Sequence, residues 1–549
     1  MIERGGHFVW ALNTLKGGIR QNLSPAEFRY RLLRNANWTN NQGLAKDRGI
    51  RRLTVETLES GNYDTVAGFD AHFNDGTQHL MVFQDDGSNT DIYVFTNSGR
   101  TWGSALGTSL ARTTPDVMMF NNKVCMFDGT TFTTMNAAKS LAQPDTAGYN
   151  ACTFGTVYAN RLLASGDATY PYSFKPSAVR NETSADPANI VDVTGVQGER
   201  ITALGLCGPY AVVGGRTFTR VYYLGTGGPK DWDYDVLSNQ VGPINQDSFV
   251  DVSLARGNET QDFAFFWGAE GPMMIVYQGK GLPSLYSLWE PLWHAIKGRG
   301  YEDMPYMNLS RMENIKGVWF PEYREVRFCF TKETGTINDA FLCLDFDSAA
   351  SYAQNPGQAY PFWRLRDNIG MNFPASTAFL ARVDQTTGLP STTGTSRVFT
   401  SRNGVVYEMD ADATFLDDGV HIPMHIKWDG FDGSEDGVRD QVKSTDHVYI
   451  HTNQAGKYEL FVNVEADEGN ESQVDSVELS GALEFWSTEP EDGAWGDGGT
   501  WNASGSLPGR TEHGVLGRRH AVEVYDSGNV SNEFYLQSVT VEGELEDRR

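Results

Sequence analysis

Short apolar runs separated by turn residues fill the middle of the chain. The runs VAGFDAHF (66–73), TQHLMVFQ (77–84) and TDIYVFT (90–96) are divided by the sequences Asn-Asp-Gly and Asp-Asp-Gly-Ser. β-branched and aromatic residues favour strands, and Asp-Gly pairs favour the tight turns that join antiparallel neighbours. Short apolar runs separated by turn residues continue to about residue 410. The pattern therefore predicts a series of β-meanders over residues 61–410.

An internal echo gives these meanders a period. Two segments match at an offset of 86 residues, and half of that offset is 43. A period of about 40 to 50 residues is typical of four-stranded propeller blades. The chain is therefore expected to be all-β, with a β-propeller of about six blades, in the range of five to seven, over residues 61–410; a stack of unrelated β-sandwiches is the alternative. The matching residues are Gly129, Thr131, Phe132 and Thr133 against Gly215, Thr217, Phe218 and Thr219.

Beyond residue 411 the apolar and polar positions alternate more strictly. Examples are DHVYIHT (446–452), KYELFVNV (457–464) and NEFYLQSVTVEGEL (532–545). Alternation with a period of two is typical of antiparallel strands that bury one face. We therefore expect a C-terminal β-sandwich domain over residues 411–549.

Residues 1–60 differ from both regions. Ser24, Pro25 and Glu27 form the pattern of a helix start, which predicts a short helix through Phe28, Leu32 and Leu33. The stretch that follows has no periodicity, so we interpret it as an extended arm that packs on the C-terminal region.

A second short helix is predicted at residues 283–297. Leu285, Leu288, Leu292 and Ile296 fall on one helical face, and Gly298 supplies a C-terminal stop. Pro291 within this stretch favours a break.

The 549 residues carry a formal net charge of -26, which excludes a generally basic surface for gripping nucleic acid. Residues 411–549 hold 29 acidic and 9 basic residues, whereas residues 1–60 hold 5 acidic and 10 basic ones. Opposite charge predicts that the arm docks on an acidic C-terminal surface of the same or a neighbouring subunit; an acidic surface that serves only solubility is the alternative. The candidate docking residues are Arg29, Arg31, Arg34, Arg48, Arg51 and Arg52, with Phe28, Leu32, Leu33 and Trp38 for packing.

Five cysteines at irregular spacing indicate neither a disulfide framework nor a zinc site. We expect them to be reduced and buried. The first twenty residues lack the apolar core of a signal peptide, and no run of eighteen apolar residues occurs. These features predict a soluble protein that folds in a reducing cytoplasm, without a membrane segment.

Candidate chemistry is sparse. The loop 432–437 (DGSEDG) resembles the start of a calcium-binding loop, but Lys443 stands where a bidentate carboxylate is required. We therefore expect no metal and no cofactor. Asp231, Asp233 and Asp235 form one of the carboxylate runs in which an acid and base pair is conceivable, but no local pattern demands an enzyme.

Several stretches, taken in order, resemble the tail nozzle proteins of short-tailed bacteriophages, also called tail tubular protein B or tail stabilisation proteins. The resemblance covers most of the chain, but the final 130 residues share only the general pattern of strands and turns and no specific residues. The stretches that carry it are 17–19 (GGI), 24–25 (SP), Gly43, 48–49 (RG), 159–163 (ANRLL), 201–204 (ITAL), 212–216 (VVGGR), 222–225 (YYLG), 403–407 (NGVVY) and 417–419 (DDG).

The resemblance implies a structural virion protein that catalyses no reaction. It implies six copies in a ring around the DNA exit channel, which retains the packaged genome and releases it on infection. The arm and the C-terminal sandwich would form a platform joined to a tail adaptor or portal assembly, with tail fibres or a spike as further partners. DNA would pass the negatively charged wall without sequence-specific binding. Assembly would take place in the host cytoplasm, and the final location would be the tail of the virion.

A carbohydrate-binding or depolymerising virion propeller is the competing interpretation. It is favoured by the aromatic content of 12% and by residues 97–102 (NSGRTW), which match half of the Asp-box turn of sialidase blades.

Overall fold

The computed structural model divides the chain into two compact units. The propeller unit comprises residues 51–363 and 372–409, and the sandwich unit comprises residues 1–50, 364–371 and 410–549. The residues that the structure describes are 7–12, 30–39, 43–54, 58, 64–96, 101–106, 110–111, 114–144, 148–185, 189–193, 195, 198–225, 227–256, 259–299, 304–356, 359–384, 387, 389–411, 415–428, 441–454, 458–467, 471–479, 507–526 and 534–545.

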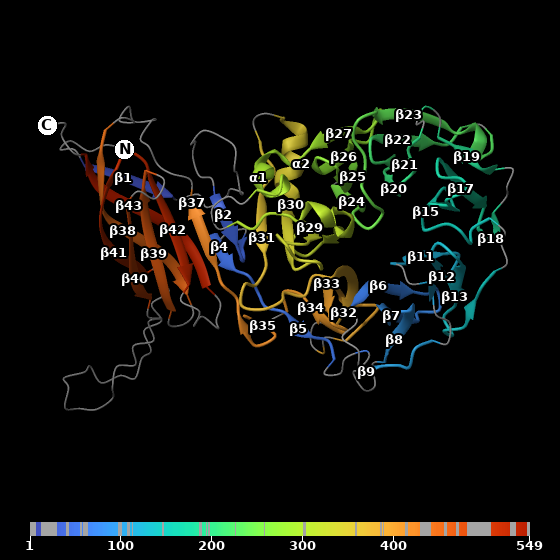
Figure 1. Ribbon diagram of the computed structural model, residues 1–549, viewed down its shortest axis with the longest axis horizontal. Coiled ribbons are helices and arrows are strands. Elements are labelled where there is room, and N and C mark those ends of the chain that lie inside the picture. Colours follow the sequence, from blue (N-terminus) through green and yellow to red (C-terminus); the bar gives the residue numbers. More distant parts are fainter. Residues whose placement is uncertain are drawn as a thin grey trace. The chain divides into compact units, whose positions relative to one another are not determined.

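Seven blades of antiparallel strands are described in the propeller unit (Figure 1). Six of them are separate sheets, and the strands between residues 316 and 345 belong to a larger sheet. We number the blades 1 to 7 in chain order. Blade 1 contains β6 (Thr65–His72), β7 (Gln78–Asp85), β8 (Asn89–Thr96), β9 (Thr101–Trp102) and β10 (Leu110–Ala111), and blade 2 contains β11 (Asp116–Phe120), β12 (Lys123–Phe127), β13 (Phe132–Met135) and β14 (Leu141–Ala142). Blade 3 contains β15 (Phe154–Tyr158), β16 (Arg161–Ser165), β17 (Ser173–Ala178), β18 (Asn181–Ala185) and β19 (Val191–Asp192), and blade 4 contains β20 (Ala203–Cys207), β21 (Tyr210–Gly215), β22 (Phe218–Tyr223) and β23 (Asp233–Ser238). Blade 5 contains β24 (Val250–Arg256), β25 (Glu259–Gly268), β26 (Gly271–Tyr277) and β27 (Ser284–Ser287). Blade 6 contains β28 (Lys316–Phe320), β29 (Glu325–Phe330) and β30 (Ala340–Asp345). Blade 7 contains β32 (Thr377–Val383), β33 (Thr395–Arg402), β34 (Val405–Glu408) and β5 (Arg51–Arg52).

The first strands of the blades contact one another in a closed circle. Each of β6, β11, β15, β20, β24, β28 and β32 contacts the next, and β32 contacts β6 again. This arrangement confirms the predicted β-propeller, with seven described blades where about six were expected. The echo also has a structural basis, because Phe132 and Phe218 each begin the third strand of their blades, and one blade lies between them.

Glycines let neighbouring blades approach closely along these inner strands. A Cβ atom at Gly68 of β6 would overlap the ring of Phe379 in blade 7, and one at Gly205 of β20 would overlap the ring of Phe249, which precedes β24. At Gly317 of β28 it would overlap a methyl group of Val250 in blade 5. Three inner strands therefore depend on the missing side chain for contact between blades.

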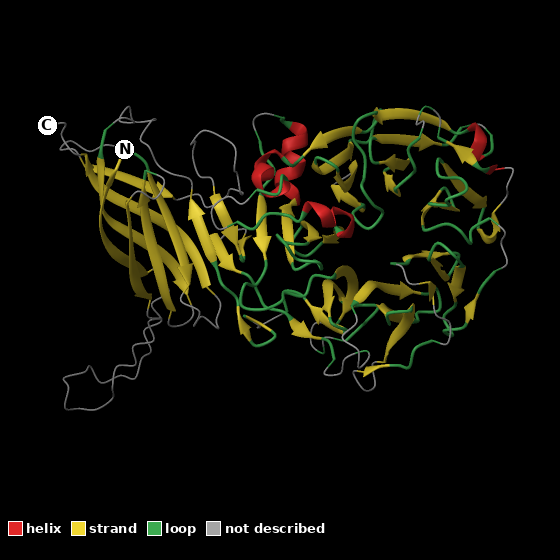
Figure 2. Cartoon of the chain, viewed as in Figure 1, coloured by secondary structure: helices red, strands yellow, loops and turns green. Residues whose placement is uncertain are grey.

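Strands dominate the described residues, and the helices are short (Figure 2). They are η2 (Pro229–Asp231), η3 (Glu290–Leu292), α1 (Trp293–Ile296), η4 (Leu309–Asn314) and α2 (Phe346–Gln354).

The helix predicted at 283–297 is correct only in its second half. Leu285 belongs to β27, where hydrogen bonding to β26 prevails over helical periodicity, and Pro291 lies inside η3. Leu288, Leu292 and Ile296 are buried.

The sandwich unit combines the N-terminal arm with the C-terminal region, as expected for the fold. One sheet has the order β3-β4-β43-β38-β41, with β1 also paired to β43, and the other contains β2-β37-β42-β39-β40. Inward-facing side chains such as Val448, Val462 and Val541 are buried. The strands are β1 (His7–Leu12), β2 (Tyr30–Arg34), β3 (Ala36–Thr39), β4 (Gly43–Lys46), β31 (Trp363–Arg366, within this unit from Arg364), β35 (Leu416–Asp417), β36 (Val420–His421), β37 (His425–Trp428), β38 (Lys443–Gln454), β39 (Tyr458–Ala466), β40 (Glu471–Leu479), β41 (Leu507–Gly517), β42 (His520–Asp526) and β43 (Phe534–Leu545).

The predicted helix through Leu32 and Leu33 is wrong for the described residues. Both side chains lie on β2, which is buried at all five positions and pairs antiparallel with β37. Continuous burial on both faces suits a central strand, since a surface helix would expose one side. Residues 21–29, which hold the helix-start pattern and Phe28, lie outside the described residues.

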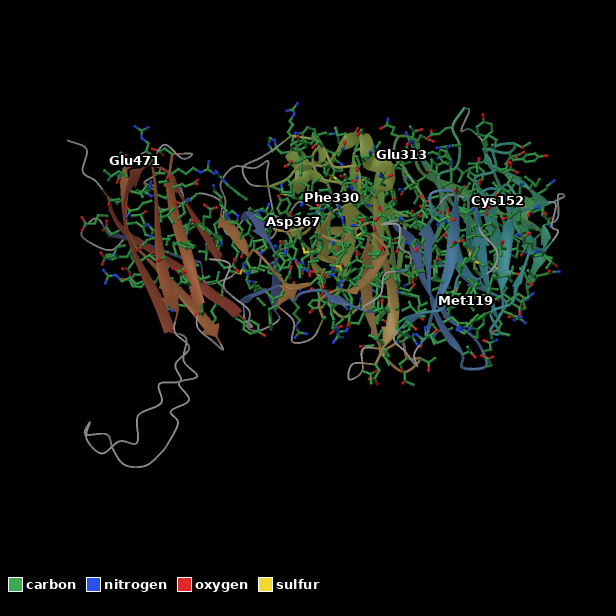
Figure 3. The ribbon with its side chains drawn as sticks, turned by 60° about the horizontal axis from the view of Figure 1, so that its bottom comes forward. Met119, Cys152, Glu313, Phe330, Asp367 and Glu471 are labelled. Atoms are coloured by element: carbon green, nitrogen blue, oxygen red, sulfur yellow. The ribbon has the colours of Figure 1, made fainter. Side chains whose placement is uncertain are left out.

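Side chains join the edge strands β40 and β41 of the two sheets. The backbone N–H groups of Leu516, Gly514 and Glu512 donate to the side chains of Glu471, Gln473 and Asp475 at 3.0, 2.9 and 3.1 Å. Figure 3 labels Glu471 at the start of β40. Polar side chains thus occupy backbone groups that an exposed strand edge would offer to another chain.

The five cysteines are free and buried, which confirms that expectation. Cys152 is labelled in Figure 3. Among the described residues, no helix is both long enough and apolar enough to cross a bilayer.

Candidate functional site

The arm joins the C-terminal region by strand pairing within the sandwich unit. Strand β2 pairs with β37, and β4 and β1 pair with β43. Leu32 and Leu33 are buried, and Trp38 is half-buried on β3. Packing and backbone hydrogen bonds therefore carry most of this contact, since exposed ion pairs contribute only about 0–1 kcal/mol each.

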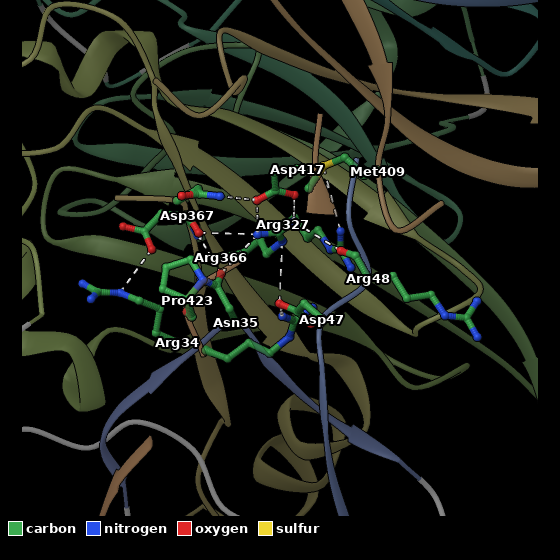
Figure 4. Close-up of polar contacts among 12 residues, drawn as sticks. Arg34, Asn35, Asp47, Arg48, Arg327, Arg366, Asp367, Met409, Asp417 and Pro423 are labelled. Atoms are coloured by element: carbon green, nitrogen blue, oxygen red, sulfur yellow. Dashed lines mark hydrogen bonds and ion pairs between the residues drawn. The ribbon is translucent and has the colours of Figure 1, made fainter. Parts of the chain in front are cut away.

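A buried ionic network connects the three chain segments of the sandwich unit (Figure 4). The guanidinium of Arg366 donates to both carboxylate oxygens of Asp417, at 3.0 and 2.5 Å, and Arg364 donates to Asp47 at 2.6 Å. Asn35 adds amide contacts, because its Oδ1 accepts from the Asp367 N–H at 3.1 Å and its Nδ2 donates to the carbonyl of Pro423 at 2.7 Å.

Electrostatics hold this network in its charged form. Burial disfavours the charged form of Arg366 and by itself would lower its pKa. The negative charges of Asp417 and Asp47 outweigh this effect, so the pKa of Arg366 lies above its ordinary value. Because both partners are inaccessible to water, removing either one would leave an uncompensated buried charge. The network therefore makes correct joining of the three segments a condition for stability.

A second buried pair links the arm directly to an acidic residue of the C-terminal region. Lys46 of β4 donates to Asp526 of β42 at 2.7 Å, and His421 and the backbone N–H of Met424 contact the other oxygen of the same carboxylate. Burial lowers the pKa of Lys46, and Asp526 partly offsets that effect. Lys46 was absent from the predicted residues, because one lysine in an aperiodic stretch carries no local signal.

The predicted arginines lie in different surroundings. Arg34 is buried and pairs with Asp367 at 3.2 Å, Arg31 is buried on β2, and the backbone carbonyl of Arg48 accepts from Arg366. Arg51 and Arg52 form β5 in the propeller unit, and Arg29 and Phe28 lie outside the described residues. The structure therefore does not gather the candidate residues into one basic patch.

Inside the propeller unit, the first strands of blades 1, 2, 6 and 7 line a polar cavity of about 130 Å³. Lys316 of β28 reaches past blade 7, donates to the carbonyl of Val66 in blade 1, and lies 3.5 Å from Asp247, next to blade 5. Asp116 of β11 also lines the cavity and accepts from the Gly155 N–H in blade 3 at 2.8 Å. Lys316 therefore ties blade 6 to blade 1, with blade 7 between them, and Asp116 joins the adjacent blades 2 and 3 beside the cavity.

Burial raises the pKa of Asp116 to about 7, with a smaller contribution from Asp247 and an opposing one from the Gly155 N–H. A carboxyl whose pKa is raised on folding disfavours the native state once it ionises. Its effect on stability is therefore absent below the unfolded pKa of about 4 and grows as the pH rises to about 7.

We expect Asp116→Asn to stabilise the propeller unit at pH 8 by about 1–3 kcal/mol and to have little effect at pH 4. The amide oxygen can still accept from Gly155, so the gain comes from removing a buried charge. Urea unfolding at both pH values measures the difference. An equal effect at pH 4 and pH 8 would show that ionisation of Asp116 is not its source.

No described group of three or more His, Cys, Asp or Glu side chains is arranged to hold a metal ion. The calcium-like loop 432–437 lies outside the described residues. Lys443, at the position where calcium needs a carboxylate, is buried and donates to the carbonyl of Arg518 at 2.7 Å.

Comparison with known proteins returns propellers and no family. No family model matches the chain, and no curated protein matches it. Similar solved structures include the N-terminal domain of Nup159, at 8% identity and a TM-score of 0.34 over 69% of this chain and 98% of that one. BBS1N in complex with ARL6DN has 9% identity and a TM-score of 0.36 over 67% of this chain and 96% of that one. BamB from Moraxella catarrhalis has 10% identity and a TM-score of 0.34 over 68% of this chain and 96% of that one.

Structural similarities at this level support no conclusion about the activity or the partners of this chain. The closed circle of the chain's own sheets defines the fold. The chain is an all-β protein that contains a seven-bladed β-propeller and a sandwich unit built from its N-terminal arm and C-terminal region.

Proposed function

We propose that this chain is a structural virion protein of a bacteriophage tail, forming a ring, or nozzle, that retains and then releases the genome. The observation that carries the proposal is the composition of the sandwich unit, in which arm strands β2 and β4 pair with C-terminal strands β37 and β43. A platform of arm and C-terminal region beside a propeller is the organisation that the tail nozzle resemblance implies.

The stretches that carry the resemblance also occupy defined places in the blades. Residues 159–163 contain the turn between β15 and β16, residues 212–216 lead into the turn between β21 and β22, and Asn403 and Gly404 form the turn between β33 and β34. Asn160 and Asn403 have positive φ there, a conformation that asparagine tolerates. These stretches therefore lie at or beside tight turns between strands of the propeller blades.

The charge balance suits passage of DNA. A net charge of -26 repels phosphate, so a wall made of several copies lets DNA slide without adhering. In the proposed virion, six copies form the ring, a portal or adaptor assembly contacts the platform, and fibres or a spike attach to the tail. The role needs no chemical step.

A nonsense mutation in the phage gene tests this role. We expect particles that lack the chain to lose packaged DNA, as measured by nuclease sensitivity, and the purified chain to restore retention when added back. Wild-type particles and particles with a mutated fibre gene serve as controls. Particles that keep their DNA without the chain would contradict the proposal, as would cleavage of host polysaccharide by the purified chain.

A further inference from the structure

We propose that neighbouring copies of this chain meet through two outer edges of the propeller, β23 of blade 4 on one copy and β5 of blade 7 on the next. The proposal rests on the ring of the proposed function and names its interface. The two edges differ in charge and lie on well-separated blades.

The β23 edge is acidic and aromatic. Asp233 and Asp235 project from one face of this strand, and Tyr234 and Val236 from the other, because side chains alternate along a strand. Tyr234 is 43% exposed and Val236 48%, and Leu224, which directly follows the neighbouring strand β22, is 59% exposed. Exposed large apolar side chains beside charges are typical of a protein interface.

Length also sets β23 apart. It has six residues, whereas the outermost described strands β10, β14 and β5 have two each, β27 has four and β18 has five. A long outer edge is normally shortened, twisted or covered, because its backbone groups can pair with another chain. Covering by a second copy satisfies that requirement.

The β5 edge is basic. Arg51 and Arg52 are both exposed on the outer strand of blade 7. Glu408 holds the Arg51 guanidinium at 2.5 Å, and the Arg52 guanidinium lies 6.0 Å from the centre of the Tyr407 ring. The blade thus fixes two cations at its rim, one on each face of the strand.

The two edges complement each other face by face. Placed beside β23, one arginine meets the face with Asp233 and Asp235, and the other meets the face with Tyr234, where a guanidinium stacks favourably on an aromatic ring. Arginine and tyrosine are also the residues most enriched at the energetic centres of interfaces.

Their placement produces a ring. Blades 5 and 6 separate blade 4 from blade 7 on one side, and blades 1 to 3 on the other, so each copy presents the two edges on opposing flanks (Figure 1). A contact between two different surfaces repeats from copy to copy and closes into a ring when the rotation allows.

Charge reversal in the full-length chain tests the pairing. One variant carries Arg51→Glu and Arg52→Glu, and the other carries Asp233→Lys and Asp235→Lys. We expect each variant alone to be monomeric by light scattering at concentrations where the wild type forms its ring. The chain with all four substitutions should regain at least half of the wild-type ring fraction, and so should an equimolar mixture of the two variants, in which every edge meets its opposite charge.

A matched control reverses two exposed cations away from both edges, Lys139→Glu and Arg311→Glu, and should leave the ring intact. Circular dichroism and melting temperature identify any variant that fails to fold. Raising the salt concentration to 1 M should lower the wild-type ring fraction, since exposed ion pairs are screened.

Three results would overturn the inference. A ring that persists in both charge-reversed variants would place the interface elsewhere while leaving the proposed nozzle intact. Loss of the ring without recovery in the mixture or the fourfold variant would show that the two edges do not pair with each other. A wild-type chain that never assembles, even on particles that lack it, would overturn the proposed function as well.

Discussion

Asp417→Ala should lower the free energy of unfolding of the sandwich unit by about 3–5 kcal/mol. The substitution removes both carboxylate oxygens that accept from the Arg366 guanidinium, and neither side chain of the pair is accessible to water. Arg366 would then keep the more distant Asp47 carboxylate, which lies 3.7 Å from its Nε. Hydrogen exchange measured by mass spectrometry resolves the effect, because peptides from the sandwich unit should lose protection while those from the propeller unit change less.

Two further variants show whether the buried charge is the cause. Glu512→Ala removes one partner of the exposed pair Arg510–Glu512 and should change stability by no more than about 1 kcal/mol. The double variant Arg366→Met with Asp417→Leu removes both charges and should recover most of the loss. A double variant as unstable as Asp417→Ala would indicate that shape or hydrogen bonding, and not charge, is what the network supplies.

Gly68→Ala should destabilise the propeller unit by about 1–3 kcal/mol. The added methyl group overlaps the ring of Phe379, which is buried and stacks on Phe399 at a centroid distance of 5.7 Å. The ring therefore has little room to move, and blades 1 and 7 must separate slightly. Thermal unfolding followed by circular dichroism measures the loss.

The comparison with Gly228→Ala isolates the steric cause. Gly228 has a φ of -70°, and a Cβ atom there would make only an ordinary contact, 3.9 Å from Oδ1 of Asn189, so alanine there should be neutral or slightly stabilising. Combining Gly68→Ala with Phe379→Leu frees space at the contact, and the two effects should be less than additive. Strict additivity would argue against a collision between these two residues.

Much of the propeller was predictable because its contacts are local. Each blade is a meander whose turns carry Asn, Asp and Gly, and the echo of Phe132 in Phe218 reports equivalent strand positions two blades apart. The exact number of blades was less accessible, because only one pair of segments retains the echo. That Arg51 and Arg52 complete blade 7 has no local signal, since their partners Glu408 and Tyr407 lie more than 350 residues away.

The arm shows where local signals mislead. The Ser24, Pro25 and Glu27 pattern favours a helix nearby, yet residues 30–34 form a strand because β37 offers backbone partners and the surroundings bury both faces. The opposite net charges of residues 1–60 and 411–549 predicted that the arm docks on the C-terminal region, but they did not predict which residues make the contact. Arg34 pairs with Asp367, a residue outside the acidic region 411–549, and Lys46 makes the direct contact with Asp526. Such pairs depend on the fold, which brings together segments that no local pattern connects.

The interleaved segments of the two units also set an order on synthesis. Strand β5 leaves the ribosome before any other strand of blade 7, β2 at residues 30–34 precedes β37 at residues 425–428, and β4 at residues 43–46 precedes β43 at residues 534–545. The strand YRLLR, which is buried in the fold, must therefore remain without its antiparallel partner until most of the chain has been made, a state that favours aggregation. Propeller closure has to wait for β34, and completion of the sandwich for β43, so a nascent-chain chaperone that shields residues 30–46 would raise the yield of folded protein more than one acting on the blades.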